Sequence, residues 1–394
     1  MAVKNNLNKN FTTSHAGLAI YAKLWNKFNL PHIFDSLVPK HSGAKYSKIA
    51  QNLFSRNLID ANSMSALSDV DKQEYFLRKN ASLNRTTYGR NLKRLNNKLR
   101  KNILTKFNNN FISHREINND SIFIYDTSPI KAEGENYENT EWVWDACEEK
   151  MICGYALNKL LLSTKNKLAV IDFELQNKDK DKTIEMFKRG RRLYGINKIV
   201  FDAGPDIRGM DFYKKLDEED FLFYTKAVSS WYFNYGKDYT VEGLKKIIKS
   251  RLKREGIVSL EVWKDDMLLR LIFVLNDARV YLTNDLEIPA GKVIQYYNRR
   301  WDIELSFREE KQNLGLNTLP CWNEEGIKTH ILLVLLAFVL SQLIINKVGI
   351  VKGIKLIKRR IVNVYAKVKE LFNRVYLIFN KSYKLWWVFS LEFG

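Results

Sequence analysis

Apolar residues recur at helical spacing from about residue 17 to residue 111, and no strand pattern interrupts them. This spacing predicts a helical N-terminal region over residues 1–115. Its last segment, residues 85–106, is predicted to form one amphipathic helix that carries eight Lys or Arg residues and no acidic residue. A solvated surface helix and a phosphate-facing surface both fit this pattern. The apolar stripe of the segment comprises Leu92, Leu95, Leu99, Ile103 and Phe107.

After residue 114 the pattern changes from helix to strand. One apolar run, SIFIYD, ends at Asp126, and a second, KIVF, ends just before Asp202. The stretch ALNKLLLSTKNKLAVIDFEL predicts a hairpin, helical patterns follow at residues 181–193 and 210–216, and the last strand is FLFYTKA. The order of three strands, helix, strand, helix and strand predicts a mixed α/β sheet over residues 116–227.

Residues 228–290 are predicted to leave this sheet as a β-rich insertion. A basic helical piece, GLKKIIKSRLKREG, precedes alternating strands that turn at Asp265 and Asp266. A helix that contains YYNRRWDIELSFREEK then opens the second part of the sheet domain, residues 291–345. The other two expectations are a helical tail over residues 346–394 and a loop over the acidic residues 133–149.

One stretch is apolar enough to suggest a membrane helix, ILLVLLAFVLSQLII at residues 331–345. It contains Ser341 and Gln342 and is shorter than the ~17 to 25 residues that span a bilayer. We therefore predict a buried core helix here, and no membrane partner.

The net charge of the chain indicates more about its partners than its overall composition does. Hydrophobic residues make up 45% of the chain and charged residues 27%, which is typical of a folded soluble protein. The 64 Lys and Arg residues exceed the 44 Asp and Glu residues and give a formal net charge of +20. A field of this sign attracts polyanions, so nucleic acid is the first expected partner and an anionic membrane surface the second.

Cysteine and histidine residues indicate neither a disulfide framework nor a zinc site. The three cysteines, Cys147, Cys153 and Cys321, form no CxxC pair, and the five histidines are scattered. The N-terminus lacks the apolar core and the cleavage site of an export signal. These features predict a reduced, intracellular protein.

Asp126 and Asp202 share a placement, because each follows a run of apolar strand residues. Ligands of open α/β sheets bind outside the carboxyl ends of strands, and two adjacent strands can hold two carboxylates close enough for one divalent ion to bridge. The alternative is that each aspartate only starts a loop by accepting hydrogen bonds from backbone amides.

Glu304 is surrounded by basic residues on the predicted helix of residues 296–311. At ~100° per residue, it shares one face with Tyr297, Arg300 and Lys311. A simple ion pair with Arg300 or Arg308 is the alternative, but it would explain one arginine and not the whole set. Phosphoryl transfer explains the set, because three carboxylates can hold two metal ions while the cations bind polynucleotide phosphates. The other acids of the helix point away and are expected to be solvated: Asp302, Glu309 and Glu310.

These residues resemble the signature of a known family. Tyr297, Arg300, Glu304 and Lys311 match, in spacing and type, the Tyr-x2-Arg-x3-Glu-x6-Lys signature of DDE transposases of bacterial and archaeal insertion sequences. The resemblance covers roughly residues 121–340. It implies that the tyrosine, the arginine and the lysine of the signature contact the DNA end.

The resemblance also implies an RNase H-like α/β fold, in which helices flank a mixed sheet. A helical DNA-binding region would occupy residues 1–115 and a β-rich insertion residues 228–290. Asp126 in YDTS and Asp202 in VFDAG resemble the first two catalytic aspartates of the family. Together with Glu304 they would be the catalytic residues and the ligands of Mg²⁺, with Mn²⁺ as a possible substitute.

The reaction implied by this family is cleavage at transposon ends and transfer of the freed 3′-hydroxyl into target DNA. The expected partners are transposon-end and target DNA and a second copy of the chain, as a homodimer on paired ends. The expected location is the cytoplasm, in association with the nucleoid. Two alternatives stay open: an RNase H-like nuclease that cleaves without joining, and a catalytically inactive, transposase-derived DNA-binding protein.

Overall fold

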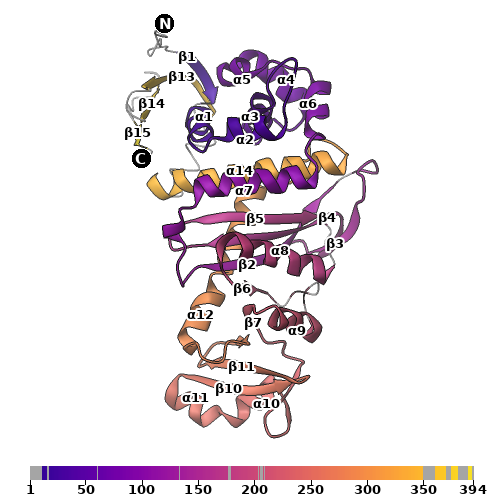
Figure 1. Ribbon diagram of the computed structural model, residues 1–394, viewed down its shortest axis with the longest axis vertical. Coiled ribbons are helices and arrows are strands. Elements are labelled where there is room, and N and C mark those ends of the chain that lie inside the picture. The colour runs from indigo at the N-terminus through magenta and orange to yellow at the C-terminus, as the bar shows by residue number, and fades with distance from the viewer. Residues whose placement is uncertain are drawn as a thin grey trace. The chain divides into compact units, whose positions relative to one another are not determined.

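The computed structural model divides the chain into two compact units (Figure 1). The sheet unit consists of Ile112–Pro129 and Val143–Phe307, and the helical unit consists of Met1–Phe111, Ile130–Trp142 and Arg308–Gly394. The structure describes residues 11–392 except for 16, 60, 133, 176–178, 203, 205–206, 208, 349–359, 370–373 and 380–388.

A mixed sheet of eleven strands forms the core of the sheet unit. Its order is β3-β4-β2-β6-β7-β12-β11-β10-β8-β9, and β5 pairs with β4. β2, β6 and β7 run parallel to one another, whereas β4 and β5 form an antiparallel hairpin. This is the RNase H-like α/β fold that the sequence predicts. The strands are β2 (Ile122–Lys131), β3 (Glu141–Asp145), β4 (Lys150–Ser163), β5 (Leu168–Leu175), β6 (Lys198–Phe201), β7 (Leu222–Lys226), β8 (Tyr232–Asn234), β9 (Asp238–Thr240), β10 (Ile257–Lys264), β11 (Met267–Val274) and β12 (Val280–Thr283).

Two helices pack on this sheet, α8 (Lys180–Tyr194) against β5 and α9 (Met210–Glu218) against β7. α8 also approaches β2 closely at Gly190. A Cβ added to Gly190 would lie 2.8 Å from Cζ of Phe123, a distance that real Cβ contacts essentially never show. Glycine at this position therefore allows the helix to pack on the strand that carries Asp126.

The prediction that residues 228–290 leave the sheet is wrong. β12 pairs with β7, so the insertion extends the same sheet through β12, β11, β10, β8 and β9. This pairing depends on contacts between distant strands, which local sequence patterns do not report. The turn predicted at Asp265 and Asp266 is confirmed, because both residues have left-handed φ angles, 46° and 63°, as in a tight hairpin turn. Two short helices, α10 (Val241–Ile247) and α11 (Lys249–Glu255), complete the insertion.

In the helical unit, α3 and α6 pack on the long helix α14. Arg56 of α3 is buried and donates to the carbonyl oxygen of Thr318 at 2.8 Å, and its Nη1 lies 3.3 Å from Nδ1 of His330 on α14. Burial lowers the pKa of His330 to about 3, so its neutral imidazole can accept a hydrogen bond from the arginine. The helices are α1 (Gly17–Lys27), α2 (Leu30–Leu37), α3 (Tyr46–Arg56), α4 (Met64–Gln73), α5 (Tyr75–Asn80), α6 (Arg85–Leu92), α7 (Asn97–Phe111) and α14 (Glu324–Val348).

The single basic helix predicted over residues 85–106 is wrong, because two helices, α6 and α7, occupy this segment. The Asn96 side chain accepts a hydrogen bond from the Leu99 amide at 3.0 Å and so caps the start of α7. Arg100 is buried and pairs with Glu325 at 2.8 Å, which removes it from the basic surface. The exposed cations of the segment include Lys93, Lys98 and Lys106.

One helix in the described part of the chain is long and apolar enough to cross a membrane by length and composition, Glu324–Ile344. Such a helix is also typical of the core of a soluble protein, and 83% of its apolar window is buried inside the protein. The buried core helix predicted in this segment is therefore confirmed.

Two further predictions are wrong, because the structure has strands in both segments. The loop predicted at residues 133–149 contains β3, and the helical tail predicted at residues 346–394 contains three strands that form a second sheet, β1-β13-β14-β15. The sequences RIVNVYAKVK and RVYLIF are rich in β-branched and aromatic residues, which favour strands. The strands of this sheet are β1 (Phe11–His15), β13 (Arg360–Lys369), β14 (Arg374–Phe379) and β15 (Phe389–Glu392).

Candidate active site

Strand register brings Asp126 and Asp202 together. Tyr125 on β2 pairs with Phe201 on the parallel neighbour β6, so the next residues on the two strands are Asp126 and Asp202. Paired positions on parallel strands carry side chains on the same face of the sheet. Asp202 follows the end of β6, as predicted, but β2 continues to Lys131, so the prediction that Asp126 ends its strand is wrong.

The same row of the sheet holds a cation that the sequence analysis missed. Val200 on β6 pairs with Tyr224 on β7, so Lys226 lies in register with Asp202. Its Nζ is 3.0 Å from Oδ1 and 3.3 Å from Oδ2 of Asp202. A signal existed in the sequence, because Lys226 ends the apolar run FLFYTK in the way that Asp126 ends SIFIYD.

Glu304 reaches this row from an interrupted helix. The single helix predicted over residues 296–311 is wrong, because α12 (Ala290–Asn298) ends before Arg300 and α13 (Trp301–Asn313) begins after it. Backbone hydrogen bonds between residues three apart close the turn that joins the two helices. This tight turn still leaves Arg300 and Glu304 in contact, as the predicted helical face requires.

Arg300 links two of the three carboxylates. Its Nη1 donates to Oε1 of Glu304 and lies 3.8 Å from Oδ2 of Asp202. Its guanidinium carbon lies 5.6 Å from the centre of the Tyr297 ring, which is buried and packs edge-on against Tyr281. Burial raises the pKa of the Tyr297 hydroxyl to about 12, so the ring stays neutral beside the arginine. Nε of Arg300 is buried and has no hydrogen-bond partner in the described part of the chain.

The pKa of Asp126 is affected by the charges of the other two acids, Asp202 and Glu304. Burial is the main reason why this pKa rises to about 6, and the negative charges of Asp202 and Glu304 raise it further. A hydrogen bond from the Thr127 amide, 2.9 Å long, and the positive charge of Arg300 act in the opposite direction. Asp126 is therefore costly to ionise without additional positive charge nearby.

The carboxylates of this group match the hard oxygen ligands that divalent metal ions prefer. The raised pKa of Asp126 also indicates that a further cation would be stabilised here. Over the described residues, no three His, Cys, Asp or Glu side chains lie at metal-binding spacing. The residues thus fit a metal ion in donor chemistry, while an arginine sets the present spacing of the oxygens. We name this group the active cluster: Asp126, Asp202, Lys226, Arg300 and Glu304.

The rest of α13 differs in part from the prediction. Lys311, the last residue of the signature, lies in the last turn of α13 and belongs to the helical unit. The prediction of solvated acids is wrong for Asp302 and Glu310. Asp302 accepts a hydrogen bond from Ser163 at 3.3 Å and burial raises its pKa, while Glu310 is fully buried. The prediction assumed that only one face of the helix is packed.

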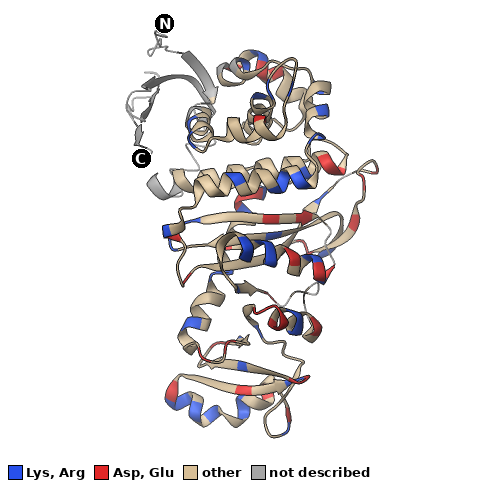
Figure 2. Cartoon of the chain, viewed as in Figure 1, with Lys and Arg blue, Asp and Glu red and all other residues tan. Residues whose placement is uncertain are grey.

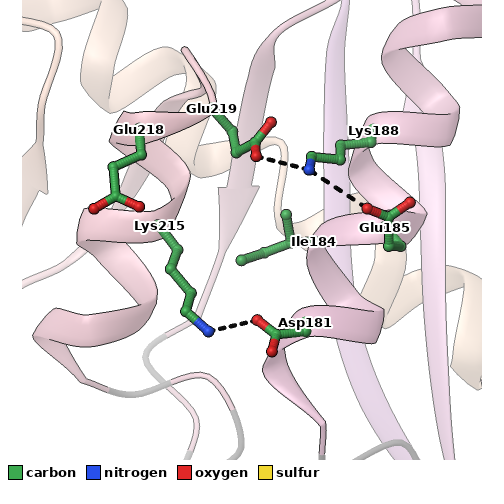
Figure 3. A pocket seen from close by; sticks show the side chains of 7 residues that line it. All are labelled: Asp181, Ile184, Glu185, Lys188, Lys215, Glu218 and Glu219. Atoms are coloured by element: carbon green, nitrogen blue, oxygen red, sulfur yellow. Dashed lines mark hydrogen bonds and ion pairs between the residues drawn. The ribbon is translucent and has the colours of Figure 1, made fainter.

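A second group of charged side chains lines a pocket between α8 and α9 (Figure 3). Lys188 pairs with Glu219 at 2.7 Å and with Glu185 at 3.4 Å, and Lys215 pairs with Asp181. Each cation of this pocket already has a carboxylate partner, so the pocket offers no uncompensated positive charge to a ligand. We name this group the surface cluster: Asp181, Glu185, Lys188, Lys215 and Glu219.

Comparison with known proteins identifies the family. A family model described as the transposase DDE domain matches residues 117–340, more than half of the chain, and the chain belongs to this family. The matched range contains the whole active cluster. No curated protein matches the sequence.

A similar solved structure is the Drosophila P element transposase strand transfer complex, with 12% sequence identity and a TM-score of 0.29. The match covers 60% of this chain, and this chain spans about half of that one, 55%. A likeness of this size supports no conclusion about function.

Proposed function

We propose that this protein is a DNA transposase that cleaves transposon ends and transfers the freed 3′-hydroxyl into target DNA. One observation carries the proposal. Asp126 and Asp202 lie in register on adjacent parallel strands, and Arg300 links Asp202 to Glu304. Three carboxylates gathered in a chain of the DDE transposase family supply the ligands that metal-dependent phosphoryl transfer requires.

The chemistry that bound Mg²⁺ supplies, or Mn²⁺ in its place, is activation of the attacking oxygen and stabilisation of the leaving one. Asp126, Asp202 and Glu304 would hold the metal ions. At the transposon end, a water oxygen attacks phosphorus, the bond to the 3′ oxygen breaks, and a 3′-hydroxyl and a 5′-phosphate result. In the target, that hydroxyl oxygen attacks phosphorus, loses its proton and displaces a second 3′ oxygen. Neither step is a redox step.

The proposed DNA contacts are Arg300, which lies among the acids, and cations outside the acid row. Figure 2 shows Lys and Arg residues along α7 and α11. We assign Arg300 and Lys311 to the transposon end, and the exposed lysines of α7 to duplex DNA in general. Tyr297 is buried beneath Arg300 in the DNA-free structure. The contact of Tyr297 with DNA stays a prediction. In the structure, the Tyr297 ring packs against the Arg300 guanidinium and orients it.

The proposed reaction also implies an oligomeric state and a cellular location for the protein. Joining two ends of one element to one target uses two active sites, so we propose a homodimer on paired ends. The net charge of +20 favours association with the nucleoid in the cytoplasm. Crosslinking on a duplex that carries both ends, compared with the DNA-free protein, would measure the assembly.

The test is a reaction with Mg²⁺, a duplex from the flanks of the encoding gene, and a supercoiled plasmid as target. We expect cleavage at the end sequence followed by end-to-plasmid joined products. Cleavage without joined products would instead identify the nuclease, and binding without either product would identify the inactive DNA-binding protein. Asp202→Asn is the matched control for contaminating nucleases, because it removes one carboxylate charge and keeps the size of the side chain.

A further inference from the structure

Two cations contact the acids of the active cluster. Asp202 contacts Lys226 on one side and Arg300 on the other, and Glu304 contacts Arg300. The two cations differ in setting. Arg300 is 17% exposed and touches two acids, whereas Lys226 is 43% exposed and the structure places it against Asp202. Arg300 is therefore the cation that sets the distance between two proposed metal ligands.

A carboxylate oxygen that accepts a hydrogen bond from a guanidinium, as Oε1 of Glu304 does, has lost the lone pair that would bind a metal ion in that direction. The positive charge of Arg300 also favours the ionised form of Asp126, which is part of what a metal ion would do. Arg300 and a divalent ion therefore compete for Oε1 of Glu304 by charge and by geometry, and for Asp202, 3.8 Å away, by charge.

The second observation is the state of Arg300 itself. Its Nε is buried and lacks a hydrogen-bond partner among the described residues. A buried donor without a partner is costly, and an acceptor that reaches it removes this cost. A phosphate oxygen is such an acceptor, and a guanidinium binds phosphate through two parallel hydrogen bonds. The arginine is thus held in the acid cluster by charge, while its buried Nε gains a hydrogen bond only if the side chain moves to an acceptor such as a phosphate.

We propose that Arg300 is a positioning residue that pairs with the carboxylates of Asp202 and Glu304, the proposed metal ligands, in the DNA-free protein and releases them when a DNA phosphate binds its guanidinium. Metal loading is then coupled to DNA binding, so a protein without DNA holds divalent ions weakly and does not cleave at random. This inference rests on the proposed function, because it takes these acids to be the metal ligands.

The test measures Mn²⁺ binding to the intact, DNA-free protein by the EPR signal of free Mn²⁺. Arg300→Ala removes the competing cation, so its affinity for Mn²⁺ should rise about tenfold, within the usual range for coupled sites. Lys226→Ala is the matched control, because it removes one equal charge that touches a single acid and does not bridge two. Its affinity should rise by about threefold or less. Arg300→Gln, which keeps hydrogen-bonding capacity without charge, should behave like Arg300→Ala and guards against a folding defect in the smaller variant.

Adding a duplex to the unmodified protein, after subtraction of Mn²⁺ bound by the duplex alone, should strengthen Mn²⁺ binding. The same addition should have little effect on Arg300→Ala. Equal Mn²⁺ affinity in the unmodified protein, Arg300→Ala and Arg300→Gln would overturn the inference. Glu304→Gln distinguishes a failure of the proposed metal site from a failure of the proposed coupling. If it leaves Mn²⁺ binding unchanged, the acids are not the metal ligands and the proposed mechanism fails. If it abolishes binding while the Arg300 variants gain none, only the coupling fails.

Discussion

The active cluster and the surface cluster contain the same kinds of residues and differ in where the fold places them. In the surface cluster the pair of Asp181 and Lys215 is solvated, since the two side chains are 71% and 45% exposed. In the active cluster Asp202 is 28% exposed and Arg300 17%. Only the second setting raises the pKa of a carboxyl to about 6, at Asp126.

The difference teaches that position on the sheet, and not charge composition, makes a reactive site. Solvated ion pairs contribute little free energy because water screens them and long side chains lose entropy. At the strand row, register fixes the acids and burial makes each added charge expensive. A cation that enters this row is therefore worth far more than one that enters the pocket between α8 and α9.

The largest expected effect comes from breaking the active cluster. Glu304→Gln keeps the size of the side chain and removes the charge that a metal ligand needs, so cleavage in Mg²⁺ should fall by at least ~100-fold, or ~2.7 kcal/mol of transition-state stabilisation. End binding in a gel-shift assay should be unchanged or slightly stronger, because one charge that repels phosphate is gone. Glu185→Gln is the matched change in the surface cluster and should cleave like the unmodified protein. Normal cleavage by Glu304→Gln would reduce Glu304 to an ion-pair partner of Arg300.

A second prediction concerns how the stability of the fold depends on pH through Asp126. Asp126 keeps its proton up to about pH 6 in the folded chain but releases it near 3.8, its ordinary value, in the unfolded chain. Between these pH values the unfolded state binds fewer protons, so the stability of the fold falls as pH rises from about 4 to 6. The loss reaches at most ~3 kcal/mol for a shift of about two units.

Asp126→Asn cannot ionise and lacks this loss. Thermal unfolding of both proteins at pH 4, 5, 6 and 7 isolates the effect, since other groups cancel in the difference. The variant should gain stability relative to the unmodified protein as pH rises, with no further gain above pH 6. A difference that does not change with pH would show that Asp126 is not held in a charge-poor setting.

Mutation of the exposed lysines of α7 should have a smaller effect, and only on the affinity for DNA. Lys98→Gln together with Lys106→Gln should weaken duplex binding and lower the slope of log affinity against log salt by ~2, about one per lost phosphate contact. The full chain is needed, because α14 completes the unit that holds α7. Mutation of Arg100 would be a poor substitute, since this residue is buried against Glu325. An unchanged salt slope would remove α7 from the DNA-binding surface.

The smallest expected effect completes the comparison. Lys215→Ala removes a solvated cation from the surface cluster, so the thermal unfolding midpoint should not change measurably. Cleavage should be unaffected. A loss of cleavage comparable to that of Glu304→Gln would mean that the pocket between α8 and α9 takes part in the chemistry after all.

Asp126 and Asp202 could be picked out from the sequence because each follows a run of apolar strand residues, and the helical spacing of Arg300 and Glu304 anticipated their contact. Lys226 was missed because a lysine at a strand end usually reads as a solvated residue, and only the register with Asp202 gives it meaning. The break before Trp301 and the pairing of β12 with β7 depend on tertiary packing, which no local spacing records.

The central claim is that Asp126, Asp202 and Glu304 bind the same catalytic metal ions, and a change of ligand tests it most directly. Each acid is replaced by cysteine in turn, and cleavage is measured in Mg²⁺ and then in Mn²⁺ or Cd²⁺. Thiolate is a poor ligand for Mg²⁺ and a better one for softer ions. The account predicts that all three variants are inactive in Mg²⁺ and regain cleavage in a softer ion, whereas Asp302→Cys, a neighbour outside the cluster, gains no such preference. Three variants that bind DNA but stay inactive in every ion would contradict it.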